Sequence, residues 1–86
     1  MIVSFHRNAL DEYIAWQNQD RKTLKRINAL LQDIIRNGSD QGIGKPEPLK
    51  YRTGWSRRID DANRLVYDVQ GDVLYIFACK GHYDDK

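Results

Sequence analysis

The chain has little cysteine and little histidine. Its 86 residues include one cysteine and two histidines, so no disulfide can form within the chain. A catalytic zinc usually needs three protein ligands, and only Cys79 and His82 lie close together in the sequence, which disfavours a metal site. A single cysteine is typical of a reducing compartment, and we expect the protein to be cytoplasmic.

Long apolar runs and cofactor motifs are also missing. The apolar run at residues 2–5 is too short for a signal peptide and far below the ~20 residues that span a bilayer. The phosphate-loop pattern GxxxxGK[ST] is absent, because GIGK at residues 42–45 is too short to form one. We therefore expect no membrane role and no bound cofactor.

Length and composition predict one small domain. The chain has a mass of 10.1 kDa, 41% hydrophobic residues and 30% charged residues, which is ordinary globular composition. We expect a single domain over residues 1–86, in which residues 84–86 form a short tail.

The positive charges are unevenly spread. The net charge is only +2, yet two regions are strongly basic, residues 20–37 and residues 43–64. Such clustering indicates a polyanionic ligand, although solvated basic helix faces are equally common. In the second region the cations are Lys45, Lys50, Arg52, Arg57, Arg58 and Arg64.

The pattern of residues predicts two helices between short strands. Residues 2–5 are typical of a strand. Asn8 is a plausible N-cap for a helix that ends near Asn18, and Asp20 can cap a second helix that Asn37 and Gly38 terminate. Glycines and prolines over residues 39–54 predict a long surface loop.

Three further strands are expected at residues 55–59, 64–69 and 73–80, joined by turns and paired antiparallel. The order is then βααβββ, an α+β fold in which a two-helix hairpin packs on one face of a mainly antiparallel sheet. Alternation assigns Leu65, Tyr67 and Val69 to the core face and Arg64 to the opposite face, which we expect to be bare. Alternation does not assign the faces of the last strand, where Cys79 is expected to be a small buried hydrophobe.

A few residues could act on a phosphodiester. Glu47 lies between two prolines in GKPEPLK, and the prolines restrict the freedom of the loop that carries it. An acid, a histidine such as His82 and several guanidinium groups suit general acid and base catalysis at phosphorus. The alternatives are that Glu47 is a structural salt-bridge partner and that His82 is an exposed terminal side chain.

Four motifs in order, GKPEPLK, WSRRI, RLVY and the closing HY, together with DEYIAWQNQD in the first helix, resemble the Txe/YoeB family of bacterial toxins in the RelE-like superfamily. The resemblance implies a microbial-ribonuclease-like fold and a toxin of a toxin–antitoxin pair. Such toxins are ribosome-dependent endoribonucleases that cut mRNA in the ribosomal A site without metal, leaving a 2′,3′-cyclic phosphate. It also implies a cognate antitoxin, similar to YefM or Axe, with an acidic C-terminal segment, and a homodimer.

The resemblance also implies roles for individual residues. Glu47 is the expected general base, His82 the general acid, Arg64 the residue that stabilises the transition state, and Tyr83 the residue that positions the nucleotide. The expected substrate-binding residues are Lys50, Trp55, Arg57 and Arg58.

Two segments depart from the family pattern, a shorter link at residues 51–54 and the added tail at residues 84–86. The shorter link could displace Glu47 from Arg64. The competing interpretation is a non-catalytic RNA- or ribosome-binding inhibitor of translation, which would use the same basic regions and aromatic stacking.

Overall fold

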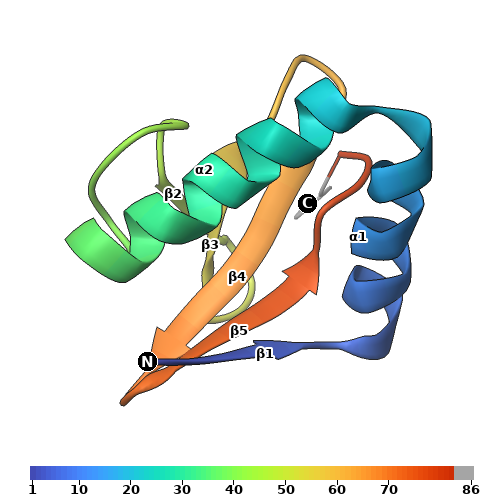
Figure 1. Ribbon diagram of the computed structural model, residues 1–86. Helices are drawn as coiled ribbons and strands as arrows, with labels where there is room; N and C mark the ends of the chain where they lie inside the picture. Colours follow the sequence, from blue (N-terminus) through green and yellow to red (C-terminus); the bar gives the residue numbers. More distant parts are fainter. Residues whose placement is uncertain (83–86) are drawn as a thin grey trace.

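One mixed sheet carries both helices on the same face in the computed structural model, which describes residues 1–82 (Figure 1). The strands follow one another across the sheet in the order β1-β5-β4-β3-β2. This arrangement confirms the predicted α+β fold. The elements are β1 (Ile2–Phe5), α1 (Arg7–Gln19), α2 (Arg21–Asn37), β2 (Glu47–Pro48), β3 (Trp55–Arg58), β4 (Arg64–Gln70) and β5 (Val73–Ala78).

The three C-terminal strands form the predicted antiparallel meander. The N-terminal strand β1 lies parallel to β5 at one edge of the sheet. At the other edge is β2, a two-residue strand inside the segment that the sequence predicted to be loop alone. Pro48 is tolerated there because an edge strand need not donate on its outer side.

The N-cap of α2 was predicted correctly, whereas the N-cap of α1 was predicted wrongly. Asp20 caps α2, since its carboxylate accepts hydrogen bonds from the backbone N–H groups of Lys22 (3.1 Å) and Thr23 (3.2 Å). Asn8 is not a cap: α1 begins at Arg7, and His6 holds the N-cap position. The side chain of Asn8 instead donates to the carbonyl oxygen of Phe77, 2.9 Å away, which ties α1 to β5.

The core lies between α2 and the helix-facing side of the sheet. The apolar stripe of α2 buries Ile27, Leu30 and Ile34 completely, as its helical spacing predicts. These side chains belong to one cluster with Leu65 and Tyr67 of β4, against which Val69 packs. The predicted core face of β4 is therefore confirmed.

A β-bulge decides the faces of the last strand. Val66 pairs with Ala78 and Tyr67 with Ile76, so Phe77 is an extra residue in β5. An extra residue shifts the alternation of the strand beyond it. Cys79 consequently lies in the core, fully buried as expected, and burial raises the pKa of its thiol to about 12.

The second face of the sheet is not bare, contrary to the prediction. Val66 and Asp68 of β4 point away from the helices, yet they are only 1% and 8% exposed. The link at residues 49–54 lies over this face: the guanidinium of Arg52 sits 4.4 Å from the centre of the Phe77 ring. Gly54 approaches the backbone of Tyr67 so closely that a Cβ there would lie 3.0 Å from its carbonyl oxygen.

A fully buried arginine ties the loop after α2 to the sheet. The guanidinium of Arg57 forms an ion pair with Asp33 of α2 and donates to the carbonyl oxygens of Gly38 (2.8 Å), Gln41 (2.6 Å) and Ile43 (3.0 Å). Its Nε donates to the hydroxyl of Tyr67. We call these contacts the Arg57 hub.

Two further hydrogen bonds close the hub. The Tyr67 hydroxyl donates to the carbonyl oxygen of Ser39 (2.6 Å), and the backbone N–H of Ile43 donates to Asp33 (3.1 Å). A Cβ on Gly42 would lie 1.7 Å from the Asp33 carboxylate, so the loop approaches α2 as closely as glycine permits. The loop that leads to β2 is therefore held from α2, β3 and β4.

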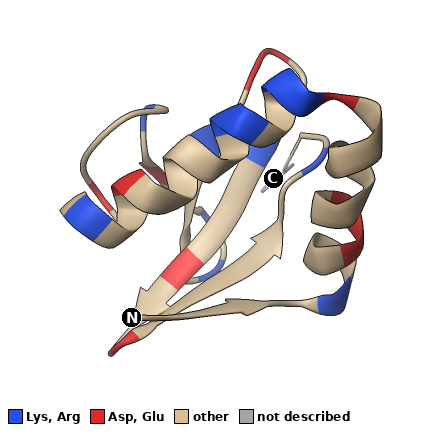
Figure 2. Cartoon of the chain, in the orientation of Figure 1, with Lys and Arg blue, Asp and Glu red and all other residues tan. Residues whose placement is uncertain are grey.

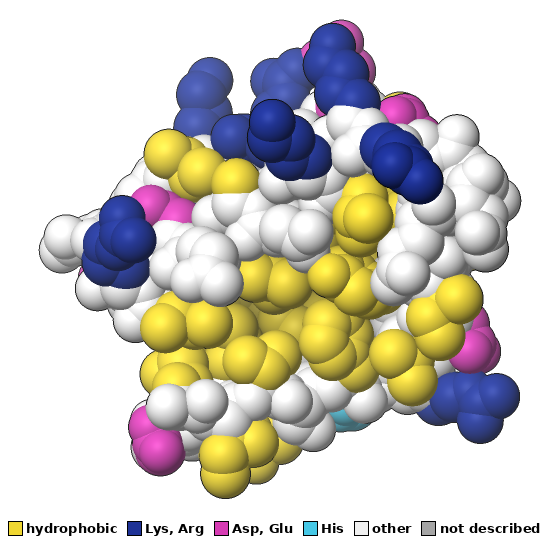
Figure 3. All heavy atoms as spheres, in the orientation of Figure 1, with side chains coloured by type: hydrophobic (Ala, Val, Ile, Leu, Met, Phe, Trp, Pro, Cys, Tyr) yellow, Lys and Arg dark blue, Asp and Glu magenta, His cyan; other side chains and the backbone are white. Residues whose placement is uncertain are grey.

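Charged and apolar side chains gather on different parts of the surface. Lysine and arginine residues recur along α2 (Figure 2), and apolar side chains fill the hollowed region between α2 and β1 (Figure 3). Neither helix has the length and apolar character needed to cross a membrane, within the residues that the structure describes. The exposed large apolar side chains of β1, α1 and α2 are Ile2, Val3, Leu10, Ile14 and Ile35.

We predict that Asp33→Ala lowers the free energy of unfolding by about 3 kcal/mol, because it leaves a buried guanidinium without its counter-charge. This is the low end for a buried pair, since the Asp33 side chain is 16% exposed. Urea denaturation at neutral pH measures the change. Asp40→Ala, in the same loop but exposed, is the matched control, and equal stabilities of the two variants would contradict the role of the hub.

The hub should also be sensitive to acid. The hydrogen bond from Arg57 holds the pKa of Asp33 below its ordinary value of 3.8. A lowered folded-state pKa contributes stability above the unfolded-state value, and this stability is lost as pH falls through the folded-state value. The difference in unfolding free energy between wild type and Asp33→Ala should be constant at pH values well above 3.8 and shrink as the pH falls through the lower folded-state pKa of Asp33. A difference that already shrinks near neutral pH would exclude this carboxylate as its source.

Candidate active site

Glu47 is placed by the hub and by the pairing of β2 with β3. The carbonyl oxygen of Gly44 accepts a hydrogen bond from the backbone N–H of Arg58 (2.7 Å), just before β2 begins. Gly44 has a φ of 83°, and a Cβ there would lie 3.1 Å from the Cβ of Arg57. Glu47 then pairs with Ser56 and keeps an exposed carboxylate. The acid therefore has an exposed side chain on a backbone that is held by strand pairing.

Arg64, the first residue of β4, has a side chain that is mostly buried and only partly satisfied. Its Nε donates to the hydroxyl oxygen of Ser56 (3.1 Å). Its Nη2 lies 3.8 Å from Oε2 of Glu47, too far for a hydrogen bond, and makes none with the chain over residues 1–82. A buried guanidinium nitrogen without a partner is an unfavourable arrangement that an anionic ligand would relieve.

The chain that carries His82 returns to the end of the sheet where β4 begins with Arg64. The backbone N–H of Arg64 donates to the carbonyl oxygen of Gly81 (3.0 Å), and the backbone N–H of Gly81 donates to the side chain of Asn63 (2.8 Å). His82 follows directly and is exposed. An imidazole therefore begins one residue beyond a backbone that is hydrogen-bonded to Arg64.

Two of the predicted catalytic residues thus flank Arg64: Glu47 through its carboxylate, and His82 through the Gly81 backbone that precedes it. The shorter link at residues 51–54 does not separate Glu47 from Arg64 in the structure. The carboxylate is 66% exposed, so its ion pair with Arg64 is weak and easily opened by a ligand. A base, a guanidinium and the start of an imidazole side chain at one end of the sheet can act on both sides of a phosphodiester.

Arg57 is not placed to bind substrate, contrary to the prediction. Its side chain is fully buried on the helix-facing side and its guanidinium is engaged in the hub. Arg57 lies two residues from both Trp55 and Ile59, so strand alternation would put all three on one face, but its charge favoured a surface role. Trp55 is half-buried and packs against the core, which limits the ring surface that it can offer to a base.

The remaining predicted residues are more accessible. Lys50 and Arg58 are exposed, and the guanidinium of Arg58 forms an ion pair with Asp61. Tyr83 and the tail at residues 84–86 lie outside the described residues. Arg58 pairs with Arg64 in the β3–β4 ladder, so its backbone lies beside the site.

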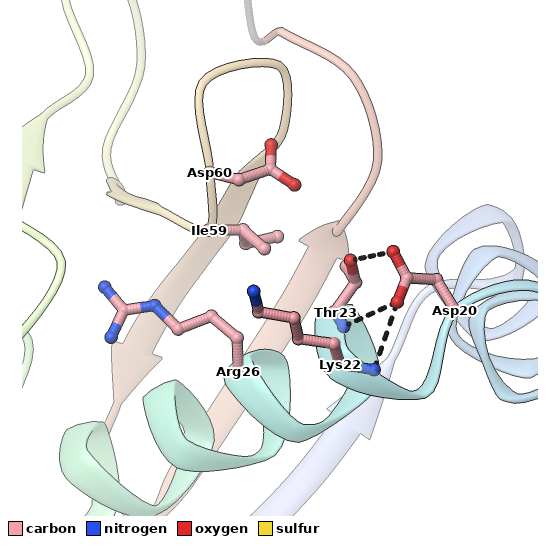
Figure 4. A pocket seen from close by; sticks show the side chains of 6 residues that line it. All are labelled: Asp20, Lys22, Thr23, Arg26, Ile59 and Asp60. Carbon is pink, nitrogen blue, oxygen red and sulfur yellow. Dashed lines mark hydrogen bonds between the residues drawn. The ribbon is translucent and has the colours of Figure 1, made fainter.

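An open pocket of about 360 Å³ lies between the start of α2 and the turn after β3, the turn that leads to Arg64 (Figure 4). Its two carboxylates already have hydrogen-bond partners. Asp20 accepts from the hydroxyl of Thr23, and Asp60 accepts from the backbone of its own turn. The catalytic candidates do not line it. Over residues 1–82, no three His, Cys, Asp or Glu side chains lie close enough together to hold a metal ion.

Comparison with known proteins decides the family. Residues 5–83 match the family model for the YoeB-like toxin of bacterial type II toxin–antitoxin systems. The toxin YoeB of Escherichia coli strain K12 is 48% identical over 85 residues, covering 96% of this chain and 100% of that protein. The chain belongs to the YoeB toxin family. It is thus the toxin of a toxin–antitoxin system, as the resemblance implied.

Solved YoeB structures agree with this assignment. The YoeB dimer from Staphylococcus aureus is 45% identical, with a TM-score of 0.91 over 96% of this chain and 98% of that chain. The heterotetrameric YoeB–YefM toxin–antitoxin complex from the same organism is 44% identical, with a TM-score of 0.90 and the same coverage. The fold and its element order are those of YoeB toxins.

Sequence reasoning missed two residues of this YoeB toxin that contact the site. Ser56 and Asn63 were not predicted to belong to the site, yet they bind the Arg64 side chain and the Gly81 backbone. The alternation of β3 puts Ser56 on the face opposite Trp55, which is the face of Arg64, and this was a usable signal. Nothing local marks Asn63, because its partner lies 18 residues further along the chain.

Proposed function

We propose that this YoeB-family toxin is a metal-independent endoribonuclease that cuts mRNA in the ribosomal A site. The observation that carries the proposal is the Glu47–Arg64 pair, in which Nη2 of Arg64 is buried and lacks a hydrogen-bond partner within residues 1–82. A scissile phosphate would fill the place beside it. The toxin would act in the cytoplasm, where translating ribosomes present the mRNA.

The reaction needs one base and one acid. Glu47 takes the proton of the ribose 2′-hydroxyl, and the 2′ oxygen attacks phosphorus. The bond from phosphorus to the 5′ oxygen breaks as His82, entering as imidazolium, gives its proton to that oxygen. The products are a 2′,3′-cyclic phosphate and a free 5′-hydroxyl; Glu47 then gives its proton to solvent and His82 takes one back from solvent.

Arg64 stabilises the negative charge that develops on the phosphoryl oxygens in the transition state. Its Nε is fixed by Ser56 at 3.1 Å, so the guanidinium is oriented before the substrate arrives. Donors held in place stabilise a transition state without reorganising, and losing one costs on the order of 3 kcal/mol. The cations Lys50 and Arg58 would bind neighbouring phosphates, and Tyr83 would position the nucleotide.

The site needs its substrate to be presented to it. The candidate base and acid are exposed, and the nearby pocket lacks the catalytic candidates. A site of this kind gains little binding energy from free RNA, which supports a reaction on mRNA already held in the A site. The basic residues along α2 (Figure 2) would add phosphate contacts.

Two protein partners are proposed. The acidic C-terminal segment of a YefM-like antitoxin would bind over the basic regions and block access of RNA, as charge complementarity favours. A second copy of the chain would form a dimer, since the related toxin from Staphylococcus aureus is a dimer. The exposed apolar side chains of β1 and α1 (Figure 3) are available for protein contacts.

The first test is the chemistry of the cut ends. Ribosomes programmed with a short mRNA should yield fragments with 2′,3′-cyclic phosphate ends when the purified toxin is added, with transition metals removed by phenanthroline. A single 2′-deoxy nucleotide before the cut should prevent cleavage, because it removes the nucleophile. Fragments that end in a 3′-hydroxyl would contradict the proposed attack, and uncut mRNA would remove the proposal.

The second test assigns the residues. Glu47→Ala and His82→Gln should each lower the single-turnover rate by about 10²- to 10⁴-fold, and Arg64→Ala by roughly 10²-fold. Thermal unfolding should be little changed for Glu47→Ala and His82→Gln, whose side chains are exposed. Undiminished cleavage in these variants would show that other residues catalyse the reaction.

The same variants separate the competing function. A non-catalytic inhibitor would still stop translation after Glu47 and His82 are replaced, because binding alone would suffice. The nuclease should lose growth arrest in both variants while still binding ribosomes in a pelleting assay.

A further inference from the structure

The chain between β5 and His82 is anchored at two points over residues 78–82. Cys79 is the first: its backbone N–H donates to Glu12 (2.8 Å), and its carbonyl oxygen accepts from the Trp16 indole (2.9 Å). Gly81 is the second, held by Asn63 and by the backbone of Arg64. Gly81 is the residue immediately before His82, so this second anchor sets where the imidazole begins.

Asn63 uses both ends of its amide. Its oxygen accepts from the Gly81 N–H (2.8 Å), while its nitrogen donates to the carboxylate of Asp60 (3.0 and 3.2 Å). That carboxylate also accepts from the backbone N–H groups of Ala62 and Asn63 (both 2.8 Å). The amide is therefore already oriented by its own turn, and little freedom is lost when it binds Gly81.

The turn itself is closed by its backbone. The N–H groups of Ile59 (3.0 Å) and Asp60 (3.2 Å) both donate to the carbonyl oxygen of Asn63. The next residue is Arg64, so one short turn ends in the side chain that holds Gly81 and in the guanidinium that faces Glu47. Figure 4 shows Asp60 on this turn, above the start of α2.

We propose that Asn63 is a positioning residue for the reaction: by holding Gly81, it places His82 at a set distance from the Arg64 site. The inference rests on the proposed function and adds a residue that acts through the general acid. Without the Asn63 side chain, Gly81 keeps its bond to the Arg64 backbone but loses its second support. The imidazole then samples more positions, and protonation of the leaving oxygen becomes slower.

The expected defect is specific to one step. Asn63→Ala should lower the single-turnover rate at saturating toxin about tenfold, the loss of one well-made hydrogen bond, with no change in the toxin concentration that gives half-saturation. An mRNA in which sulfur replaces the 5′ bridging oxygen has a leaving group that needs no proton. On that substrate, Asn63→Ala and His82→Gln should both approach the wild-type rate, whereas Glu47→Ala should stay slow.

A matched control is Asn28→Ala, which removes another asparagine whose side chain accepts a hydrogen bond, here from Tyr13 (2.6 Å). It should leave both substrates unaffected. Equal slowing of Asn63→Ala on the oxygen and sulfur substrates, or no slowing on either, would overturn the inference. A wild-type toxin that cuts neither substrate would instead end the proposed function, and a slow His82→Gln on sulfur would remove its general acid.

A second measurement does not depend on activity. Amide hydrogen exchange of Gly81 should be protected in the wild-type toxin and at least about tenfold faster in Asn63→Ala, while the amides of the core strands are unchanged. An unprotected Gly81 amide in the wild type would overturn the inference. Global loss of protection in Asn63→Ala would mean that Asn63 holds the whole fold, which would also contradict a positioning role.

Discussion

The buried guanidinium of Arg57 is the contact on which the site depends. It binds Asp33 in α2, three carbonyl oxygens of the loop after α2, and Tyr67 in β4. A loop of glycines, prolines and polar residues cannot bury enough apolar surface to order itself. The guanidinium of Arg57, with its positive charge and five N–H donors, supplies the hydrogen bonds and the ion pair that order this loop. The strand that bears Glu47 comes directly after the loop, so its position depends on these contacts.

The site divides into fixed and exposed parts. Arg64 is oriented by Ser56 and mostly buried, whereas Glu47 and His82 are exposed side chains on backbones held by hydrogen bonds. Positioning the backbone and leaving the two groups proposed to transfer protons at the surface would suit a substrate that arrives on another large particle. It also leaves the proposed catalytic groups open to an acidic partner that would cover them.

The charge pattern was informative as a whole and misleading for individual residues. The two basic regions that the sequence predicted do lie at the surface along α2 and near the site. One cation of the second region, Arg57, is nonetheless in the core, and another, Arg52, lies over an aromatic ring on the far face. Counting charges along a chain cannot separate a cation that binds a ligand from one that satisfies carbonyl oxygens.

The sequence by itself determined the helical stripe of α2, its Asp20 cap, the antiparallel meander and the proposed base, guanidinium and acid, because each is a matter of local spacing or a short motif. Tertiary structure decided the rest. The bulge at Phe77 placed Cys79 on the core face, and the link at residues 49–54 covered the face expected to be bare. The side chain of Asn63 accepted a hydrogen bond from the Gly81 backbone. These outcomes depend on which distant groups pair, and pairing over long separations leaves no period in the sequence.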